Sequence, residues 1–589
     1  MFTTRPEIQG TFGAVASTHW LASSAAMAML ERGGNAFDAA VAGGLVLQVA
    51  EPHLNGPGGE VPIILYSAKE KRARVICGQG VAPEAATIER FQSLGLDMVP
   101  GTGLLSAVVP GAFDAWMTLL RDHGTMTLAE VFEIALGYAE HGVPVHGMVT
   151  GTIDSVAELF TTEWKSSADT FMPGGKTPQP GTLFANKGIA KTWARLLREA
   201  HSAGAGRDAQ IDAARRAWSQ GFVAEAIDEY CRNTEAMDTS GERHGGLLTA
   251  DDMAGWQATY EDPVAYDYHG YTVLKTGPWA QAPVFLQQLA LLKGFDIAAM
   301  DPVGADFVHT VVECAKLAFA DREAYYGDPH FADVPMTGLL SDGYNDGRRK
   351  LVDGEASMEL RPGSVDGRNV RVGQAAATAA GAPGAGEPTV AKLGEKRGDT
   401  VHIDVVDRWG NMVTATPSGG WLQSSPVIPA LGFPLTSRAQ MFWIEDGLPG
   451  SLAPKKRPRT TLTPTMVMRG DDPYLAFGTP GGDQQDQWQL IAFLRHVHHG
   501  MNLQEMIDLP SFHTEHFPSS FYPRAATPGR VVLEDRFSKA TLDELTRRGH
   551  LIEAGDAWSE GRLSAVSRRD GMIRAGANPR GMQGYAVGR

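Results

Sequence analysis

A segment rich in alanine, glycine and proline at residues 373–386 is followed by the regular sequence TVHIDVVD at Thr400–Asp407. The first segment has too few bulky apolar side chains to pack a core, so it is expected to be a flexible linker. In the second segment polar and apolar residues alternate, which predicts a β-strand with one face of each kind. The apolar residues of this strand are Val401, Ile403 and Val405, and the polar ones are Thr400, His402 and Asp404.

Thr400 is the residue of this strand with the most direct chemical interpretation. From the pattern alone, the strand and the DRWGN turn after it form a half-buried edge hairpin with a solvated polar face. A second hypothesis is nucleophilic catalysis, because a threonine hydroxyl reacts when an adjacent base takes its proton. Cleavage of the chain directly before Thr400 would supply that base, since a free α-amino group has a pKa of about 8.

The sequence FGTPGGDQ at residues 477–484 places Gly481 and Gly482 between a predicted strand and a helix that begins near Gln484. Backbone N–H groups beside a helix N-terminus stabilise an oxyanion, so these glycines are candidates for that function. An ordinary strand–helix turn is the simpler explanation, and Asp483 is expected to cap the helix. The spacing matches neither a dinucleotide-binding loop nor a Walker loop, so nucleotide binding is not predicted.

Composition argues against several kinds of partner and cofactor. The chain has 589 residues and a net charge of −16, so neither nucleic acid nor an anionic membrane surface is expected to bind it. Its three cysteines are too few for a disulfide framework, and the HTEH sequence at residues 513–516 matches no zinc spacing. No metal and no cofactor is therefore predicted. No secretory signal and no apolar stretch of membrane-spanning length is recognised, which predicts a cytoplasmic protein.

Strand patterns lie before and after a mainly helical middle of the chain. Helices are predicted from Trp20 to Arg32 and from an N-cap at Asn35 to Val49. Further strands are predicted at Thr400–Val406, Met412–Thr416, Met466–Met468 and Tyr474–Phe477, and further helices at Asp486–His499, Leu503–Asp508 and Lys539–Arg548. This order predicts an α+β fold with a sheet-containing core and helical layers outside it.

Several sequence blocks occur in the order and near the spacing of one enzyme family. They are GGNAFDAAVAGG, GPGGE and FADREAYYGDPHF before the linker, and GDTVHIDVVDRWGNMVTAT, KKRPRTTLTPTMVM and FGTPGGDQ after it. Nearly the whole chain resembles the γ-glutamyltranspeptidase family. The resemblance implies an N-terminal-nucleophile hydrolase with a four-layer αββα sandwich, formed jointly by a large and a small subunit of one self-cleaving precursor. It divides the chain into a large-subunit part at 1–372, a linker at 373–399 and a small-subunit part at 400–589.

The resemblance also implies functions for individual residues. It matches Thr400 to the catalytic nucleophile, and Gly481 and Gly482 to the glycines of the oxyanion hole. Ser418 lies where the family has a threonine that hydrogen-bonds to the nucleophile. Thr460 and Thr461 replace a serine pair that contacts the substrate α-carboxylate, and Gln440 matches a glutamine of the glutamate pocket.

Three positions depart from the family pattern. Gln79 replaces the arginine for the substrate α-carboxylate, Trp443 replaces the aspartate for the α-amino group, and Gly420 replaces a pocket asparagine. A charge-assisted contact in a buried site contributes about 1.5–3 kcal/mol, so losing two or three of them removes most affinity for a γ-glutamyl group. The catalytic residues are thus retained and the specificity residues altered. Among relatives with this profile, the sequences GPGGEVP, SGGWLQSSP and GMQGYAVGR are most similar to the oxamate amidohydrolase branch of the family.

We therefore expect an autoproteolytic N-terminal threonine amidohydrolase that cleaves a small, carboxylate-bearing, oxamate-like amide through an acyl-enzyme. Thr460 and Thr461, with Arg438 or Arg459, are expected to hold the carboxylate in a shallow pocket floored by Trp443. An exposed loop position is the simpler interpretation of Arg438. The expected partners are the amide substrate and the two fragments of the precursor, and the sequence is compatible with a homo-oligomer. The alternatives are a γ-glutamyl hydrolase or transferase with a rebuilt pocket, an acylase for bulkier amides, and an unprocessed, non-catalytic binding protein.

Overall fold

The computed structural model describes residues 2–204, 206–374 and 400–589. Most of the predicted linker at 373–399 lies outside the described residues, so the linker and the division of the chain at Thr400 stay predictions. None of the helices in these ranges combines the length and the apolar content that a membrane span requires.

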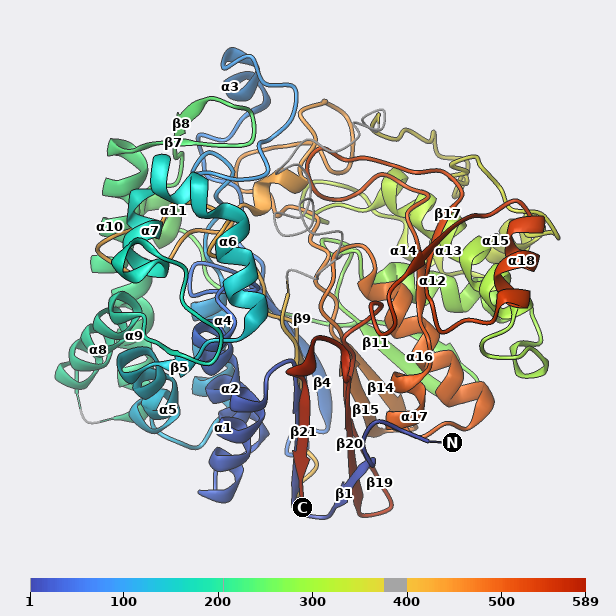
Figure 1. Ribbon diagram of the computed structural model, residues 1–589, viewed down its shortest axis with the longest axis horizontal. Coiled ribbons are helices and arrows are strands. Elements are labelled where there is room, and N and C mark those ends of the chain that lie inside the picture. Colours follow the sequence, from blue (N-terminus) through green and yellow to red (C-terminus); the bar gives the residue numbers. More distant parts are fainter. Residues whose placement is uncertain (1, 205, 375–399) are drawn as a thin grey trace.

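Two seven-stranded sheets lie face to face at the centre of the molecule (Figure 1). Neighbouring strands within each sheet are antiparallel. The first sheet contains, in spatial order, β21 (Tyr585–Gly588), β2 (Gly13–Ser17), β12 (Ile403–Asp407), β13 (Met412–Ala415), β3 (Val61–Ser67), β4 (Arg72–Gly78) and β9 (Thr259–Glu261). The second contains β1 (Ile8–Gly10), β20 (Met572–Ala577), β19 (Ser564–Arg569), β15 (Asp472–Gly478), β14 (Thr465–Arg469), β11 (Tyr271–Lys275) and β10 (Val264–Tyr268).

β12 shows how an alternating sequence builds these layers. Ile403 and Val405 pack into the apolar cluster that the first sheet shares with the helices outside it, whereas Val406 packs between the two sheets. His402 and Asp404 lie on the same face as Val406 because side chains of a strand alternate, and both are fully buried. β12 pairs with β2 on one side and β13 on the other, so the interpretation of this segment as an edge hairpin with a solvated face is wrong.

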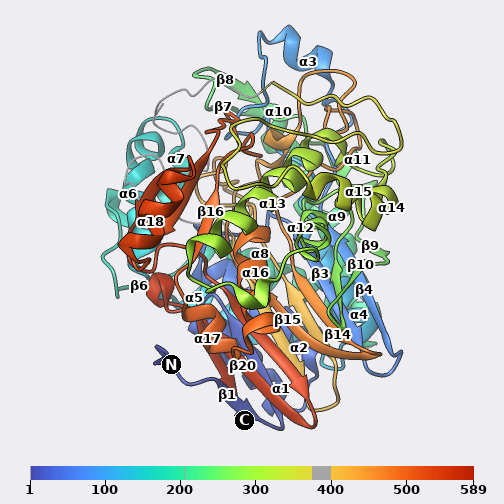
Figure 2. The ribbon, with the colours of Figure 1, turned by 90° about the vertical axis from the view of Figure 1, so that its right-hand side faces the viewer.

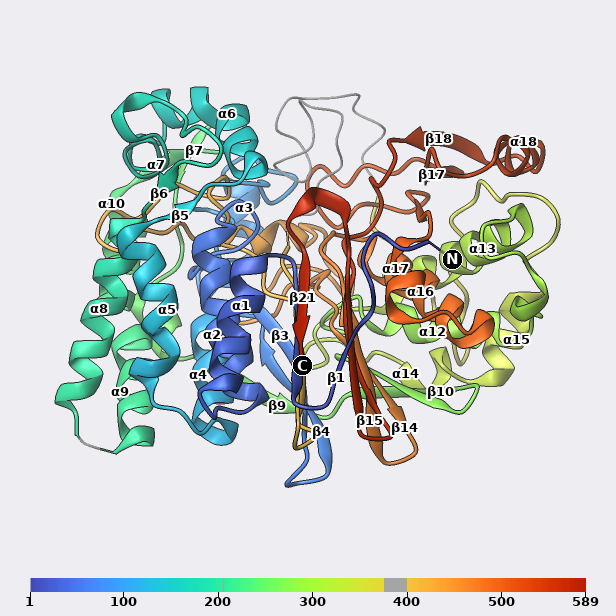
Figure 3. The same ribbon diagram turned by 60° about the horizontal axis from the view of Figure 1, so that its bottom comes forward.

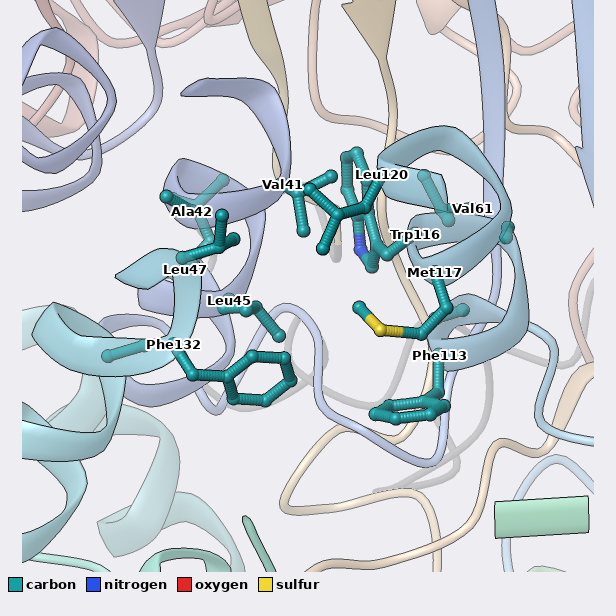
Figure 4. Close-up of a cluster of buried hydrophobic side chains, with 14 of the residues drawn as sticks. Val41, Ala42, Leu45, Leu47, Val61, Phe113, Trp116, Met117, Leu120 and Phe132 are labelled. Atoms are coloured by element: carbon teal, nitrogen blue, oxygen red, sulfur yellow. The ribbon is translucent and has the colours of Figure 1, made fainter. Parts of the chain in front are cut away.

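Helices cover the outer face of the first sheet (Figures 1 and 3). The two helices predicted near the N-terminus are confirmed, and Asn35 forms a capping box with Asp38 at the start of the second. Gly44 allows the close packing around Trp116 seen in Figure 4, because a Cβ at this glycine would lie 2.5 Å from the indole ring. The helices of this layer are α1 (Trp20–Glu31), α2 (Ala36–Ala50), α4 (Ala112–His123), α5 (Leu128–His141), α8 (Lys187–Ser202), α9 (Arg207–Ser219) and α10 (Phe222–Asn233).

A second helical layer covers the outer face of the second sheet (Figure 2). Its apolar core joins Val467, Leu475 and Phe477 of the strands to the helices. The strands and helices predicted after the linker are present, with boundaries that differ by up to three residues. The helices of this layer are α12 (Pro283–Leu292), α13 (Ala305–Tyr325), α16 (Gln485–His499), α17 (Leu503–Asp508) and α18 (Lys539–Arg547).

The layers follow the order helix, sheet, sheet, helix, and the predicted four-layer αββα fold is confirmed. Both sheets contain strands from before and after residues 375–399. The remaining helices and strands are α3 (Ile88–Ser93), α6 (Gly147–Thr162), α7 (Lys165–Phe171), α11 (Ala250–Ala254), α14 (Met336–Leu339), α15 (Asp342–Arg349), β5 (Val143–Pro144), β6 (Leu183–Phe184), β7 (Glu235–Met237), β8 (Arg243–Gly245), β16 (Phe512–Thr514), β17 (Arg530–Glu534) and β18 (Leu551–Gly555).

Candidate active site

Thr400 is fully buried in the segment that leads into β12. It forms an isolated β-bridge with Ser418, and its Oγ1 donates a hydrogen bond to Ser418 Oγ at 3.2 Å. The backbone of Ser418 is held by Glu60, whose carbonyl accepts its N–H at 3.0 Å and whose N–H donates to its carbonyl at 2.9 Å. The structure therefore brings the two predicted hydroxyl groups together and fixes both by backbone pairing.

Arg438 is buried beside this hydroxyl pair, in a short 3₁₀ segment at Arg438–Met441. Its guanidinium donates to Glu60 Oε1 at 2.5 Å and to Ser418 Oγ at 3.0 Å. The guanidinium also lies 5.1 Å from the centroid of the Trp421 ring. The interpretation of Arg438 as an exposed loop residue is wrong, because its charge is fully enclosed and paired with a buried carboxylate.

His402 connects the segment of Thr400 to the second sheet. Its ring nitrogens lie 2.9 Å from Thr416 Oγ1 and 2.9 Å from Asp404 Oδ1. Asp404 accepts a further hydrogen bond from Ser564 Oγ of β19 at 2.9 Å. The imidazole packs directly against Gly478 at the end of β15, where any Cβ would collide with the ring. The polar face of the predicted strand thus holds the two sheets together at the end where Thr400 lies.

Gly481 and Gly482 form the turn between β15 and α16. Gly481 has a φ of +123°, and a Cβ there would lie 2.6 Å from the Trp488 ring, so glycine is required by both backbone and packing. The Gly482 carbonyl accepts hydrogen bonds from Gln281 Nε2 at 3.3 Å and from the Gln485 N–H at 3.2 Å. Among the described residues neither glycine N–H has an acceptor. The loop therefore presents free donors beside the N-terminus of α16, as anion stabilisation requires.

Asp483 joins a buried ion network and does not cap α16, so the predicted capping function is wrong. Its carboxylate accepts from Ser520 N–H at 2.8 Å, from Ser520 Oγ at 2.6 Å and from Arg322. Arg322 also pairs with Glu323 at 2.7 Å, and Glu323 pairs with Arg459 at 2.8 Å. Burial opposes ionisation of Asp483, but the Arg322 charge and the Ser520 hydrogen bonds outweigh it and lower the pKa of this carboxyl.

Thr460 and Thr461 follow Arg459 and are fully buried. The Thr460 N–H donates to the Trp279 carbonyl at 3.1 Å, and its carbonyl accepts the Gln281 N–H at 2.8 Å. Gln281 therefore contacts both the threonine pair and Gly482, which places the pair next to the glycine turn. Thr461 Oγ1 has no hydrogen-bond partner among the described residues, so this buried hydroxyl is available to a ligand.

Trp443 lies beneath a buried arginine that the sequence did not identify. The guanidinium of Arg524 lies 4.1 Å from the centroid of the Trp443 ring. Arg524 Nη2 donates to the carbonyls of Gln440 and Phe442 at 3.0 and 2.9 Å, whereas Nη1 has no partner among the described residues. The chain at Gly373 crosses the indole so closely that a Cβ there would lie 2.7 Å from it.

The remaining predicted substrate positions are occupied by local packing. The Gln440 amide donates to the Gly101 carbonyl at 3.0 Å, and the buried Gln79 amide donates to the carbonyl of the next residue at 3.1 Å. Gly420 has a φ of +63°, and a Cβ there would lie 2.9 Å from the backbone of Gly58. No larger side chain fits at Gly420 without moving that backbone.

Glu51 is linked through Thr18 to the segment that carries Thr400, and the sequence did not identify it. The Thr18 N–H donates to the His402 carbonyl at 3.1 Å, and Thr18 Oγ1 donates to Glu51 Oε2 at 2.7 Å. Gln583 Nε2 donates to the other carboxylate oxygen. Burial raises the pKa of Glu51 to about 7, against the opposing effects of the Thr18 hydrogen bond and the Arg562 charge.

The ranges that the structure describes contain no group of three or more His, Cys, Asp or Glu side chains placed to hold a metal ion. His513 of the HTEH sequence pairs with Glu560 at 2.6 Å and with Glu515 at 3.5 Å. Cys77 is buried, and burial raises the pKa of its thiol to about 12, so it is not a thiolate nucleophile.

A family model described as gamma-glutamyltranspeptidase matches residues 22–588 of the chain. The chain belongs to the γ-glutamyltranspeptidase family. It is 30% identical over 585 residues to the glutathione hydrolase-like YwrD proenzyme of Bacillus subtilis strain 168, covering 98% of this chain and 99% of the relative. It is 28% identical over 590 residues to the oxamate amidohydrolase proenzyme of Klebsiella pneumoniae subsp. pneumoniae, covering 98% of each.

Two solved structures match this member of the γ-glutamyltranspeptidase family over its whole chain. The structure titled LmbA2991HD is 58% identical with a TM-score of 0.95 and full coverage of both chains. A cephalosporin acylase from Bacillus halodurans is 26% identical with a TM-score of 0.83, covering 100% of this chain and 97% of the other. The protein is thus an N-terminal-nucleophile hydrolase of amide bonds that is made as a proenzyme.

Two of the four site residues that sequence reasoning missed in this family member carry a signal in the sequence. Arg322 and Glu323 are charged residues within α13, a helix whose residues are otherwise mainly apolar and buried. A charged pair inside an apolar helix predicts a buried ion network, because unpaired charges there are strongly destabilising. Arg524 lies in a loop and Glu51 lies at the end of α2, and nothing in the sequence around either residue indicates burial.

Proposed function

We propose that Thr400 is the nucleophile of this amide hydrolase, released as a new N-terminus by self-cleavage of the bond between Asp399 and Thr400. The observation that carries the proposal is the buried 3.2 Å contact from Thr400 Oγ1 to Ser418 Oγ, with Arg438 donating to the same serine oxygen. A positive charge and a hydroxyl network beside Thr400 favour the negative charge that develops on its oxygen.

The glycine turn and the new α-amine complete the chemistry. In the precursor the Thr400 hydroxyl attacks the preceding carbonyl, the acyl group shifts from nitrogen to oxygen, and water hydrolyses the ester. In the mature enzyme the Thr400 α-amine takes the hydroxyl proton as the oxygen bonds to the substrate carbonyl carbon. The N–H groups of Gly481 and Gly482 stabilise the oxyanion, the C–N bond breaks and the proton passes to the leaving nitrogen. Water then hydrolyses the acyl-enzyme and regenerates Thr400.

The topology supports a cleaved enzyme whose fragments stay together. The proposed parts at 1–372 and 400–589 each contribute strands to both seven-stranded sheets. Separation of the fragments would break backbone ladders in both sheets and expose the apolar layer between them.

A carboxylate on the acyl group of the substrate would supply acceptors for three buried, unpaired donors. Thr461 Oγ1, Arg459 Nε and Arg524 Nη1 are buried without a partner among the described residues. A buried cationic donor left unsatisfied is costly, and a carboxylate supplies charged acceptors. Both arginines named from the sequence pair with a buried glutamate, but each guanidinium nitrogen of Arg438 has a partner, whereas Arg459 Nε has none among the described residues. We therefore assign the carboxylate to Arg459, together with Arg524.

The packing at three positions supports specificity for a short acyl group over a γ-glutamyl group. Trp443 is covered by Arg524 and by the chain at Gly373, and its indole supplies no carboxylate in place of the missing aspartate. Gly420 has no space for an asparagine side chain, and the Gln79 amide bonds to its own backbone neighbour. The Klebsiella relative named as an oxamate amidohydrolase matches this chain over 98% of its length, which supports an oxamate-like substrate.

Hydrolysis of oxamate and of γ-glutamyl-p-nitroanilide by the same purified enzyme tests this specificity. We expect kcat/KM for oxamate to exceed that for the anilide by at least about 100-fold, the cost of two lost charged contacts. Arg524→Gln is expected to raise KM for oxamate by about tenfold, whereas Arg243→Gln, which alters a surface ion pair, leaves it unchanged. Preference for the anilide would instead show a rebuilt γ-glutamyl pocket.

Acylase activity on bulkier amides is the second candidate. The full-length structural match to a cephalosporin acylase favours it. Rapid hydrolysis of a β-lactam side-chain amide, with no turnover of oxamate, would replace the oxamate-like proposal with this one.

A further inference from the structure

A cavity of about 440 Å³ lies next to the glycine turn, outside the groups assigned above. Its walls come from the start of α6, from β17, and from two C-terminal segments at residues 555–562 and 580–582. Figure 3 shows α6 and the β17–β18 pair near the same end of the central sheets. The apolar side chains of its lining are Met148, Val532, Ala557, Trp558 and Met582.

Two contacts connect this cavity to the turn at Gly481. Arg562, which lines the cavity, donates its backbone N–H to Thr479 Oγ1 at 2.9 Å. A Cβ at Gly561 would lie 3.2 Å from Trp488 Cγ, and a Cβ at Gly481 would lie 2.6 Å from Cζ3 of the same indole. One aromatic ring therefore separates the cavity wall from the proposed oxyanion donors.

Several charges around the cavity are already paired by the protein. Arg580 donates to Glu534 Oε1 at 2.7 Å and to two backbone carbonyls. Glu560 pairs with His513, and Glu553 pairs with Arg530. The Trp558 ring is held in place by Arg536, whose guanidinium lies 3.4 Å from its centroid. An uncharged group in this cavity would pack on the indole of Trp558 and on the apolar side chains of the lining, among them Met582, which is 76% exposed.

We propose that this cavity binds the amine half of the substrate amide, and that this half carries a flat apolar ring. The inference rests on the proposed function, because it takes cleavage of an amide at Thr400 as given. In the chain, Asp483 and its arginine network follow the glycine pair, whereas Thr479 and its contact with the cavity wall precede it. The cavity lining includes none of Arg459, Thr461 and Arg524, so the acyl carboxylate and the amine ring are assigned to separate binding sites, both connected to Gly481 and Gly482. A volume of about 440 Å³ lies in the range of small-molecule pockets and accommodates a substituted ring.

The test compares oxamate with N-(2-naphthyl)oxamate, which share one acyl group and differ only in the amine. The variants are Trp558→Ala and Met582→Asp; Met582 has a φ of +61°, a backbone conformation that aspartate tolerates. The control is Trp409→Ala, an indole that is 48% exposed in the turn between β12 and β13. We expect the ratio of kcat/KM for the naphthyl amide over oxamate to fall at least about tenfold in both variants and to stay constant in the control. An unchanged ratio in the two cavity variants would overturn the inference.

Direct binding separates this inference from the proposed function. The fluorescence of 2-naphthylamine, the product amine, is titrated with the wild-type protein and with each variant. We expect binding to wild type that weakens at least about fivefold in Trp558→Ala and Met582→Asp and is unaffected in Trp409→Ala. No binding to wild type, or equal binding to all four proteins, contradicts the cavity assignment. If 2-naphthylamine binds as predicted but the enzyme hydrolyses neither oxamate nor N-(2-naphthyl)oxamate, the result contradicts the proposed substrate and still supports the cavity assignment.

Discussion

Arg438 and Glu60 form a fully buried ion pair, 2.5 Å between nitrogen and oxygen, and the same guanidinium donates to Ser418 Oγ at 3.0 Å. Glu60 directly precedes β3, in the part of the chain before the predicted linker, and Arg438 lies in the part after it. The pair therefore joins the two proposed fragments at the hydroxyl that accepts the hydrogen bond of Thr400.

Removal of one member of this pair is expected to be strongly destabilising. Arg438→Met removes the buried charge that pairs with the Glu60 carboxylate, which costs about 3–5 kcal/mol of unfolding free energy. The double variant Arg438→Met/Glu60→Gln is expected to recover most of that loss but to cleave itself more slowly than wild type, because Ser418 Oγ loses its charged donor. Urea unfolding measured on uncleaved Thr400→Ala backgrounds gives the stabilities. Additive losses in the double variant would show that the two residues do not interact.

Gly481→Ala is expected to reduce kcat by about 10²–10³-fold, the usual effect of losing an oxyanion donor. The added methyl group would lie 2.6 Å from the Trp488 ring, so the turn must move its N–H groups. Gly470→Ala is the matched control, because Gly470 also has positive φ, +61°, but open space where the Cβ would be. Single-turnover kinetics on both variants separate the loss of an oxyanion donor from the strain of an alanine at positive φ. Turnover by Gly481→Ala within twofold of the control would contradict the oxyanion assignment.

Glu51 is expected to make stability depend on pH between about 4.5 and 7. Its pKa in the folded protein is raised by burial to about 7, above the value of 4.5 in the unfolded chain. The folded state therefore keeps a proton that the unfolded state releases, so this stabilising contribution is complete below pH 4.5 and is lost as pH rises through 7.

Comparison with Glu51→Gln isolates this carboxyl. Relative to wild type, the variant is expected to gain up to about 3 kcal/mol of unfolding free energy between pH 5 and pH 8. Glu31→Gln, which alters an exposed ion pair with Arg589, serves as the control and is expected to show no such difference. Parallel pH profiles for wild type and Glu51→Gln would contradict the raised pKa.

The strands and helices of this fold were predictable where apolar residues recur with the period of a strand or a helix, because this pattern shows which face is buried. The alternation in TVHIDVVD predicts a strand, and the capping sequence at Asn35 predicts the start of α2 correctly. The same alternation gives no information on which strands lie beside β12. Its neighbours are β2, far away in sequence, and β13, so a central strand between two packed sheets looks like an edge hairpin from local pattern alone.

The charged groups of the site were the least predictable part. Arg438 and Asp483 have loop-like sequence surroundings, for which solvent exposure and helix capping are the usual expectations. Glu60 is 378 residues away from Arg438 in the sequence, and Arg322 is 161 residues away from Asp483. Only the folded chain brings each pair together. Local sequence does not encode the burial of a charge whose partner is distant, whereas the family resemblance predicted functions for Thr400, Ser418 and the two glycines by motif.

Self-cleavage before Thr400 is the central claim, and mass spectrometry with denaturing electrophoresis tests it most directly. Freshly purified wild type, Thr400→Ala and the conservative Thr400→Ser are compared after identical incubation. We predict that wild type and Thr400→Ser yield two bands, the smaller spanning residues 400–589 with residue 400 as its N-terminus, while Thr400→Ala stays a single chain of 589 residues without amide hydrolysis. An intact wild-type chain that hydrolyses amides, or cleavage of Thr400→Ala at the same bond, would contradict the account.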